Sequence, residues 1–202
     1  MSRRIGVTQR CADDEATGER RYALDARWFE FLSACGVLAV PLPNIAEVAL
    51  RTADELSLDG FLFTGGGDLA EAGGNQPERD ETERELLALA IREGRPVLGV
   101  CRGMELIATA LGARLKPVDG HVATRHTITQ EDGERVVNSY HDLAVDGLPA
   151  EVVVTAWCED VVEAVRHRDA PVEGIMWHPE REPVHAQPDL LLVRRLFRAV
   201  DR

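Results

Sequence analysis

Short apolar runs alternate with longer amphipathic segments over the first 115 residues. The short runs are uninterrupted, as in buried strands, whereas the longer segments repeat apolar residues at three- and four-residue spacing, as in helices. We expect strands over 5–8, 37–42, 60–63 and 97–100, and helices over 25–34, 44–56, 77–93 and 102–111. Asn44 is expected to cap the second of these helices.

This alternation predicts a parallel sheet with helices on both faces, an α/β fold. After Gly112 the pattern changes to short runs joined by turns. We expect further strands over 125–129, 135–138, 151–156, 161–167 and 174–177. A closing helix is predicted over 188–200. No internal repeat or linker interrupts the chain, so residues 1–202 are expected to form a single domain.

Composition narrows the possible partners. The chain has 202 residues, and 45% of them are hydrophobic. It contains 35 Asp and Glu residues and 23 Lys and Arg residues, so its formal net charge is −12. Such acidity argues against nucleic acid or an anionic membrane as a partner. No apolar run approaches the roughly 20 residues of a membrane helix, and no signal-peptide core follows the charged start. We therefore expect a cytoplasmic protein.

One cysteine lies where a nucleophile is expected. Cys101, flanked by Gly99 and Gly103, joins the strand 97–100 to the helix that begins at Arg102, which is the layout of a nucleophile elbow. The helix points its amide dipoles at the sulfur, which predicts a lowered thiol pKa. The backbone N–H of Arg102 is also placed to donate to an oxyanion. The alternative is a small buried cysteine without chemistry.

A base candidate follows the last predicted strand, in the sequence His178-Pro179-Glu180. Residues two apart on an extended chain share a face, and Pro179 favours an extended His178. His178 and Glu180 are therefore expected to point the same way, as the base and orienting acid of a triad with Cys101. The alternative is a strand end with a proline stop and a surface glutamate.

The other histidines carry weaker signals. The His141 side chain either lines a pocket or forms hydrogen bonds within a turn. His121 and His126 lie in a segment without helical pairing or a nearby cysteine, so no zinc site is expected there. The four cysteines show no CxxC spacing, and no metal or cofactor is predicted.

The glycine run Thr64-Gly65-Gly66-Gly67-Asp68 follows the strand 60–63. Its spacing loosely matches a dinucleotide fingerprint, but the glycines and proline that follow would break the helix that such a site requires. Because glycine has no side chain to block its backbone N–H, the N–H groups of this run are instead candidates to stabilise an oxyanion.

Four motifs occur in one order: Thr64-Gly-Gly-Gly67-Asp, Gly-Val-Cys101-Arg-Gly, Asn138-Ser-Tyr-His141 and Trp177-His178-Pro-Glu180. Together they resemble the class I glutamine amidotransferase-like superfamily, and within it the γ-glutamyl-γ-aminobutyrate hydrolase (peptidase C26) branch. The resemblance covers nearly the whole chain. It implies a flavodoxin-like α/β fold with a mostly parallel central sheet.

The resemblance also implies the roles of the site residues. Cys101 is the nucleophile that forms a thioester, His178 the base and acid, and Glu180 the orienter. The implied oxyanion hole comprises Gly66, Gly67 and the Arg102 N–H. The residues expected to contact the substrate are Glu105, Tyr140, His141, Gln9 and Arg10.

Glu105 departs from the commonest pattern of the superfamily, in which glutamine stands at this position. It follows Cys101 by four residues on one helix face, so its charge opposes thiolate formation. It is either an acceptor for the α-ammonium of a γ-glutamyl group or a buried structural acid.

We expect an enzyme that hydrolyses a γ-glutamyl amide to glutamate and an amine. The segments Ile5–Arg10 and Asp25–Trp28 resemble a γ-glutamyl-CDP-amidate hydrolase subgroup. This resemblance implies that Gln9, Arg10 and Arg27 contact a phosphate or head group of the substrate. The alternative is that these three residues lie on a solvated surface or at an ordinary strand end, without a role in binding. Adducts of γ-glutamyl with a polyamine or aminobutyrate are the other substrates expected.

Two further functions stay open. A glutaminase subunit would work with a separate synthetase; no synthetase domain fits in 202 residues, which favours a free-standing hydrolase over this alternative. A catalytically silent binding protein is disfavoured by the intact Cys101, His178 and Glu180. The sequence leaves a homo-oligomer open.

Overall fold

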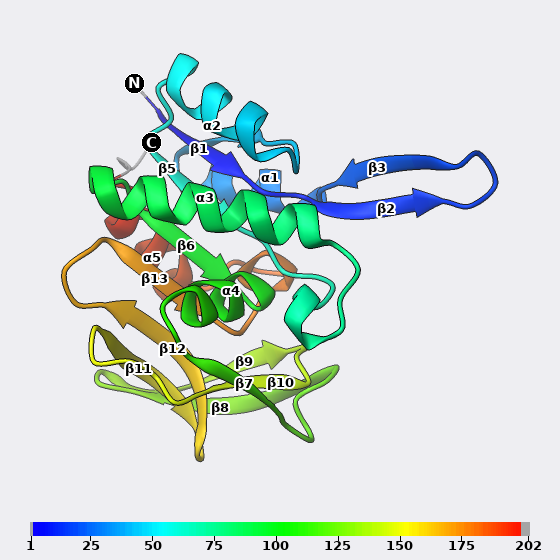
Figure 1. The fold of residues 1–202 in the computed structure, drawn as a ribbon. Helices are drawn as coiled ribbons and strands as arrows, with labels where there is room; N and C mark the ends of the chain where they lie inside the picture. Colours follow the sequence, from blue (N-terminus) through cyan, green and yellow to red (C-terminus); the bar gives the residue numbers. More distant parts are fainter. Residues whose placement is uncertain (1, 199–202) are drawn as a thin grey trace.

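A computed structural model describes residues 2–198. Its main sheet has nine strands: β1 (Arg3–Val7), β4 (Val37–Pro41), β5 (Gly60–Phe63), β6 (Val97–Val100), β8 (Thr124–Gln130), β9 (Gly133–Ser139), β11 (Val152–Cys158), β12 (Val161–His167) and β13 (Val172–Ile175). The spatial order is β4-β1-β5-β6-β13-β12-β11-β8-β9. The first five strands in this order are parallel and the rest antiparallel, which confirms the predicted fold class (Figure 1).

The helices are α1 (Arg27–Ala34), α2 (Ala46–Glu55), α3 (Pro77–Glu93), α4 (Arg102–Ala110) and α5 (Gln187–Phe197), with the 3-10 turns η1 (Ala70–Ala72) and η2 (Pro179–Arg181). Two small antiparallel pairs complete the fold: β2 (Arg10–Asp14) with β3 (Glu19–Ala23), and β7 (Arg114–Pro117) with β10 (Leu143–Asp146). No helix within residues 2–198 has the length and apolarity needed to cross a membrane.

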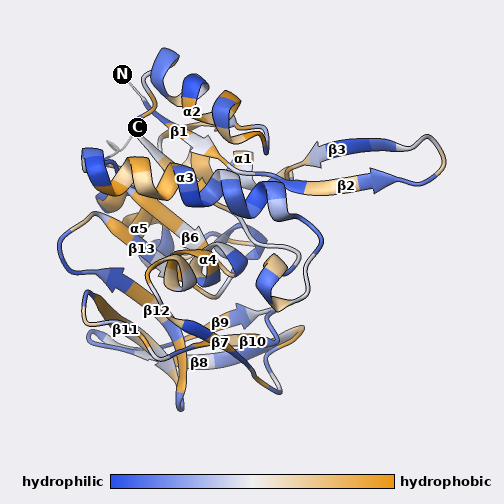
Figure 2. Ribbon diagram, viewed as in Figure 1, coloured by the Kyte–Doolittle hydropathy of each residue, from blue (hydrophilic) through white to orange (hydrophobic). Residues whose placement is uncertain are grey.

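Alternate residues of the parallel strands enter two separate cores. Leu62 and Leu98 pack in a cluster with the apolar residues of α1 and α5. Phe61, Phe63 and Val97 point the other way, into a cluster with α2, α3 and α4. Because successive strand residues face opposite sides, the apolar run of β6 in Figure 2 fits a strand covered on both faces.

Most predicted elements agree with the structure to within a few residues. The hairpin β2–β3 was not predicted; it extends from the body in Figure 1, and β3 is largely hydrophilic in Figure 2. The predicted Asn44 cap is wrong, since Ile45 is the N-cap of α2 and Nδ2 of Asn44 donates to the Gln9 carbonyl at 2.7 Å. The predicted end of the closing helix, Val200, lies outside the described residues.

Candidate active site

Cys101 occupies a sharp turn between β6 and α4. Its backbone has φ 53° and ψ −114°, a conformation that a non-glycine residue seldom adopts. A Cβ atom on Gly99 would lie 2.5 Å from the carbonyl group of Gly103, and one on Gly103 would collide with the Phe63 carbonyl oxygen. The two glycines therefore let α4 pack directly on β5 and β6, and this packing holds the strained turn.

The Cys101 thiol is nearly buried, with the residue 8% exposed. Burial and the neighbouring Glu105 raise the pKa of the thiol to about 12, although a hydrogen bond from the Arg102 N–H acts in the opposite direction. The lowered thiol pKa predicted from the helix dipole is therefore wrong, because loss of hydration outweighs the helix terminus. A thiolate at this site needs a base to accept the proton.

His178 and Glu180 form a buried pair. Nδ1 of His178 lies 2.7 Å from Oε1 of Glu180, and both residues are 2% exposed. The predicted extended geometry is wrong for Glu180, since it lies in the turn η2. Asn138 holds the backbone of His178 on both sides: its Oδ1 accepts the His178 N–H and its Nδ2 donates to the His178 carbonyl, each at 2.8 Å.

His178 and Cys101 meet at Gly65. A Cβ atom on Gly65 would lie 3.2 Å from Nε2 of His178 and 3.2 Å from Cβ of Cys101. The absence of a side chain at this position thus leaves the imidazole and the thiol facing one space. Cys101 and His178 also line one pocket of about 130 Å³, together with Gly66, Gly67, Asp68, Glu105, Tyr140, His141, Asp142 and Arg181.

The glycine loop is oriented by Arg79. Its guanidinium donates to the carbonyl oxygens of Thr64, of Gly65 at 3.3 Å and of Gly66 at 2.8 Å. In a trans peptide the N–H points opposite to the C=O. The N–H groups of Gly66 and Gly67 therefore point away from Arg79, and both glycines line the pocket of Cys101.

Arg79 belongs to a buried ion network that the sequence analysis missed. Glu83 accepts from Nε of Arg79 at 2.9 Å, from Nη1 of Arg102 at 2.5 Å and from Oγ1 of Thr8 at 2.6 Å. The Arg102 side chain also pairs with Asp80. The signal was present: positions 79 and 83 lie on the helical stripe of the apolar residues 86, 87 and 90, so charges there were candidates for buried partners.

Glu105 lies on the wall of the same pocket and is 4% exposed. Burial raises its carboxyl pKa to about 7, although His141 and Arg102 lower it. Burial alone would lower the pKa of His141, but its contacts with Glu163 and the Leu143 carbonyl raise it. The pocket thus holds a carboxyl group that titrates near neutrality.

The other predicted contact residues are divided between two places. Tyr140 stands edge-on to the ring of His178 at 5.6 Å, and the Arg181 guanidinium lies 4.4 Å above the tyrosine ring. Arg10 lines an adjoining pocket that also includes His178. Gln9 donates to the Leu42 carbonyl at 2.9 Å and, among residues 2–198, is not part of either pocket wall.

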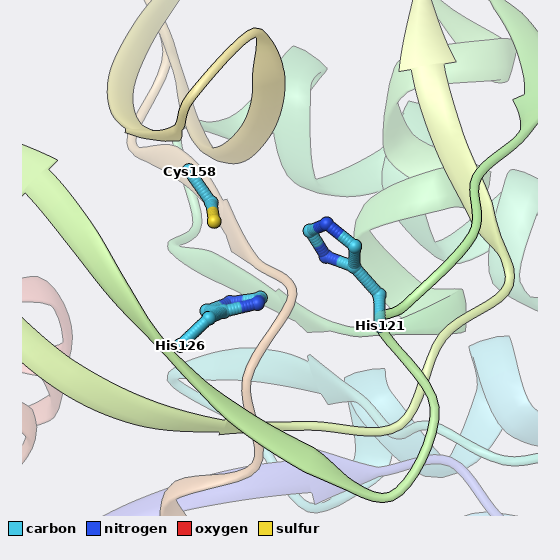
Figure 3. Close-up of side chains that lie close together, drawn as sticks. All are labelled: His121, His126 and Cys158. Carbon is cyan, nitrogen blue, oxygen red and sulfur yellow. The ribbon is translucent and has the colours of Figure 1, made fainter.

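Away from the thiol, His121 and His126 approach Cys158. A ligand atom of each lies within 4.8 Å of the others, and Figure 3 shows the three side chains pointing toward a common space. The sequence-based statement that no cysteine lies near these histidines is therefore wrong in three dimensions. The strand order of the antiparallel half brings β8 beside β11, which the local sequence does not encode.

The fold and this arrangement define an α/β protein with a cysteine elbow facing a histidine–carboxylate pair. The family model for class I glutamine amidotransferases matches residues 34–194. The chain therefore belongs to the class I glutamine amidotransferase family.

Three relatives illustrate the range of this family. The chain is 29% identical to a γ-glutamyl-CDP-amidate hydrolase of Campylobacter jejuni over 182 residues, covering 88% of this chain and 90% of the relative. It is 36% identical to anthranilate synthase component 2 of Thermococcus kodakarensis, over 53% of this chain and 56% of the relative. The structure of a provisionally assigned GMP synthase subunit from Thermoplasma acidophilum matches with a TM-score of 0.75 at 19% identity, covering 98% of this chain and 94% of that chain. The last comparison supports the fold alone.

Proposed function

We propose that the protein hydrolyses a γ-glutamyl amide bond, with Cys101 as nucleophile, His178 as base and acid, and Glu180 as orienter. One observation carries the proposal. Nε2 of His178 and Cβ of Cys101 each lie 3.2 Å from one point beside Gly65, both residues line one pocket, and Nδ1 of the same ring lies 2.7 Å from the buried Glu180. A nucleophile, a base and a third group that fixes the base are the parts that covalent acyl transfer needs.

The first half of the reaction forms a thioester. Because the thiol pKa is about 12, the thiol is protonated at neutral pH, and His178 removes its proton as the sulfur attacks the γ-carbonyl carbon. The N–H groups of Gly66, Gly67 and Arg102 stabilise the oxyanion. The imidazolium then gives its proton to the departing amine, and the C–N bond breaks.

The second half releases glutamate. His178 takes a proton from water, whose oxygen attacks the thioester carbon, and the same amides stabilise the second oxyanion. Collapse of this intermediate breaks the C–S bond, and the thiolate recovers a proton from His178. The cycle uses one water molecule and needs no metal or other cofactor.

Glu105 is the proposed anchor for the glutamyl end of the substrate. Its carboxylate is buried in the wall beside Cys101, where a substrate α-ammonium would pair with it and keep it ionised. Tyr140 and His141 line the same space and are proposed to contact the glutamyl group.

The leaving amine is proposed to extend toward the adjoining pocket lined by Arg10 and Arg181. Two guanidinium groups suit a phosphate, which favours a nucleotide-linked amine of the kind named for the Campylobacter jejuni relative. An amine adduct of aminobutyrate or a polyamine is the competing substrate. Arg27 is paired with Asp25 at 2.5 Å, so it would have to exchange this partner to bind a phosphate.

A glutaminase subunit of a two-component enzyme is the second candidate. It is favoured by the similarity to anthranilate synthase component 2, a protein named as one component of a synthase. Under this proposal, hydrolysis of glutamine would become fast only in the presence of a separate synthetase.

The test is glutamate release by the purified protein from glutamine, γ-glutamyl-aminobutyrate, a γ-glutamyl polyamine and γ-glutamyl-CDP-amidate. We expect release from one γ-glutamyl compound other than glutamine, and its loss in Cys101→Ala. Cys35→Ala is the matched control, because Cys35 is buried in the core between α1 and β4. Release that persists in Cys101→Ala would exclude the proposed nucleophile, and no release from any compound would exclude a free-standing hydrolase of these substrates.

A further inference from the structure

Three histidines and one glutamate gather in the antiparallel half of the fold. His121 precedes β8, His126 lies within it, His141 follows β9, and Glu163 lies in β12. Glu163 and His141 are 0% and 2% exposed, and the His126 side chain is 12% exposed. Segments far apart in the sequence thus bring four ionisable side chains to one largely dry place.

The carboxylate of Glu163 has no ordinary hydrogen-bond partner among residues 2–198, and neither has either ring nitrogen of His126. The nearest polar atoms to the carboxylate are ring nitrogens: Nδ1 of His121 at 3.2 Å, Nε2 of His141 at 3.3 Å and Nε2 of His126 at 3.4 Å. A buried carboxylate without donors is costly, and such groups usually have a partner or bind an ion.

The orientation of His141 explains why hydrogen bonds alone satisfy this cluster poorly. Its Nδ1 lies 2.8 Å from the Leu143 carbonyl oxygen, and a carbonyl accepts only, so Nδ1 carries the proton. In the neutral ring Nε2 then presents a lone pair to the same space as the Glu163 carboxylate. A ring that binds metal through one nitrogen and donates to a backbone carbonyl through the other is the usual arrangement of a histidine ligand.

The spacing of three of these atoms fits a tetrahedral ion. Nδ1 of His121, Nε2 of His141 and Oε1 of Glu163 are separated from one another by 3.3, 3.2 and 3.3 Å. Ligands at about 2.0–2.1 Å from a tetrahedral zinc ion are about 3.3 Å apart. One ion can therefore contact all three atoms without any of them moving far.

We propose that the chain binds one divalent transition-metal ion of the zinc type, through His121, His126, His141 and Glu163. Nε2 of His126 lies 3.4 Å from the second carboxylate oxygen of Glu163, and its side chain would have to turn toward the ion to supply the fourth ligand, because its own close neighbours are His121 and Cys158. Cys158 lies beside the site (Figure 3) but outside this ligand set. With four protein ligands the ion is structural: it ties β8, β12 and the end of β9 together and fixes His141 on the wall of the Cys101 pocket.

The proposal is tested by metal binding, independently of any hydrolase activity. The 202-residue protein is treated with a chelator, dialysed, and titrated with Zn²⁺ against a chromophoric competitor and with Co²⁺ by absorption spectroscopy. We expect one ion per chain, a higher melting temperature with Zn²⁺, and a tetrahedral Co²⁺ spectrum without a thiolate charge-transfer band. Binding of less than one ion per chain, or a thiolate band, would overturn the proposed site.

Matched variants locate the ion. Glu163→Gln and His126→Ala are each expected to weaken Zn²⁺ affinity about 100-fold or more, since even indirect partners of a ligand contribute 10- to 100-fold. Cys158→Ser and Cys101→Ala are expected to bind Zn²⁺ with the affinity of the unmodified protein. Cys101→Ala is included because zinc also binds reactive thiols. Loss of binding in Cys101→Ala would place the metal in the catalytic pocket and reject the proposal.

Folding of each metal-free variant is checked by circular dichroism. Glu163 is fully buried, so Glu163→Gln can perturb the fold; His126 is partly exposed, and His126→Ala then decides. Unchanged affinity in a folded His126→Ala protein would refute the four-residue ligand set.

Discussion

Oε1 of Glu180 lies 2.7 Å from Nδ1 of His178, with both residues 2% exposed. Under the proposed mechanism, a carboxylate in this position would hold the ring in one orientation and stabilise the imidazolium formed when the Cys101 thiol loses its proton. Orientation of the ring and stabilisation of the imidazolium can be separated by a substitution that removes the charge of residue 180 but keeps its shape.

Glu180→Gln retains a hydrogen-bonding group but removes the charge. We expect kcat for glutamate release to fall between about 100- and 10,000-fold, with KM changed only a few-fold, because the lost interaction acts when the imidazolium forms. Steady-state kinetics on the active substrate measures both constants. Glu173→Gln is the control: Glu173 is a partly buried carboxylate paired with the exposed Arg195 and outside both pockets at Cys101 and His178, so its loss should leave kcat unchanged. A Glu180→Gln enzyme with unchanged kcat would remove Glu180 from the mechanism.

Glu105→Gln should change thiol reactivity and substrate binding in opposite directions. The charge of Glu105 is one cause of the raised Cys101 pKa, so its removal should speed alkylation of Cys101 by iodoacetamide at neutral pH. The lost partner for the α-ammonium should raise KM. Mass spectrometry identifies the alkylated cysteine, and Cys101→Ala provides the blank. Faster alkylation without a rise in KM would favour the alternative role of Glu105 as a structural acid.

The same substitution has a predicted pH signature in stability. The carboxyl pKa of Glu105 rises from 4.5 to about 7 on folding, so its ionisation opposes the folded state. The wild-type protein should therefore lose stability relative to Glu105→Gln as pH rises from about 4.5 to 7, by on the order of 3 kcal/mol, and the difference should be constant above that range. Urea unfolding of both proteins between pH 4 and 9 measures it. A pH-independent difference would contradict the raised pKa.

The parts of the site that follow from local sequence were predictable. The run 97–100, the glycines around Cys101 and the helix after it specify the elbow within a few consecutive residues. The central α/β alternation was predictable for the same reason, because each strand and helix has its own hydrophobic period.

The parts of the site that depend on residues far apart in the sequence could not be predicted. The helical stripe marks Arg79 and Glu83 as candidates for burial, but the sequence does not reveal that the carbonyl groups of the glycine loop and Arg102 are their partners. The cluster around Glu163 requires the order of the antiparallel strands, which a single sequence does not reveal. Neither strand of the hairpin β2–β3 has a buried residue, so no apolar pattern marks it.

Glu83→Gln tests the buried network beneath the glycine loop. Glu83 is completely buried between Arg79 and Arg102, and removing its charge leaves two buried cations poorly compensated. We expect a loss of about 3–5 kcal/mol in the free energy of unfolding. Glu55→Gln is the control, since Glu55 pairs with Arg51 at the same i,i+4 spacing but in solvent, and should cost less than about 0.5 kcal/mol.

The direction of the Glu83 pKa adds a pH test. The guanidinium groups of Arg102 and Arg79 outweigh burial and hold the pKa of Glu83 below its usual value of 4.5. Its charge therefore stabilises the fold above about pH 4.5, and this contribution is lost as pH falls further. The difference between wild type and Glu83→Gln in urea unfolding should shrink at acidic pH. A difference that grows on acidification would contradict the network as described.

Gly103→Ala examines whether the elbow is held by close packing. The added Cβ would collide with the Phe63 carbonyl oxygen, so either α4 moves away from β5 or the Cys101 turn changes. We expect a loss of about 2–3 kcal/mol in stability, with glutamate release falling more than stability alone explains, because Cys101 sits on the displaced turn. Urea unfolding and single-turnover kinetics on the same preparations separate these two effects.

Gly112→Ala is the control for backbone conformation. Gly112 has a φ of 106° and no atoms within 4 Å of an added Cβ, so alanine there is strained but meets nothing, and should cost about 1 kcal/mol. Gly103 does not have a positive φ, so its larger predicted cost comes from contact alone. If the two variants lost the same stability and Gly103→Ala kept full activity, the close approach of α4 to β5 would not be what positions Cys101.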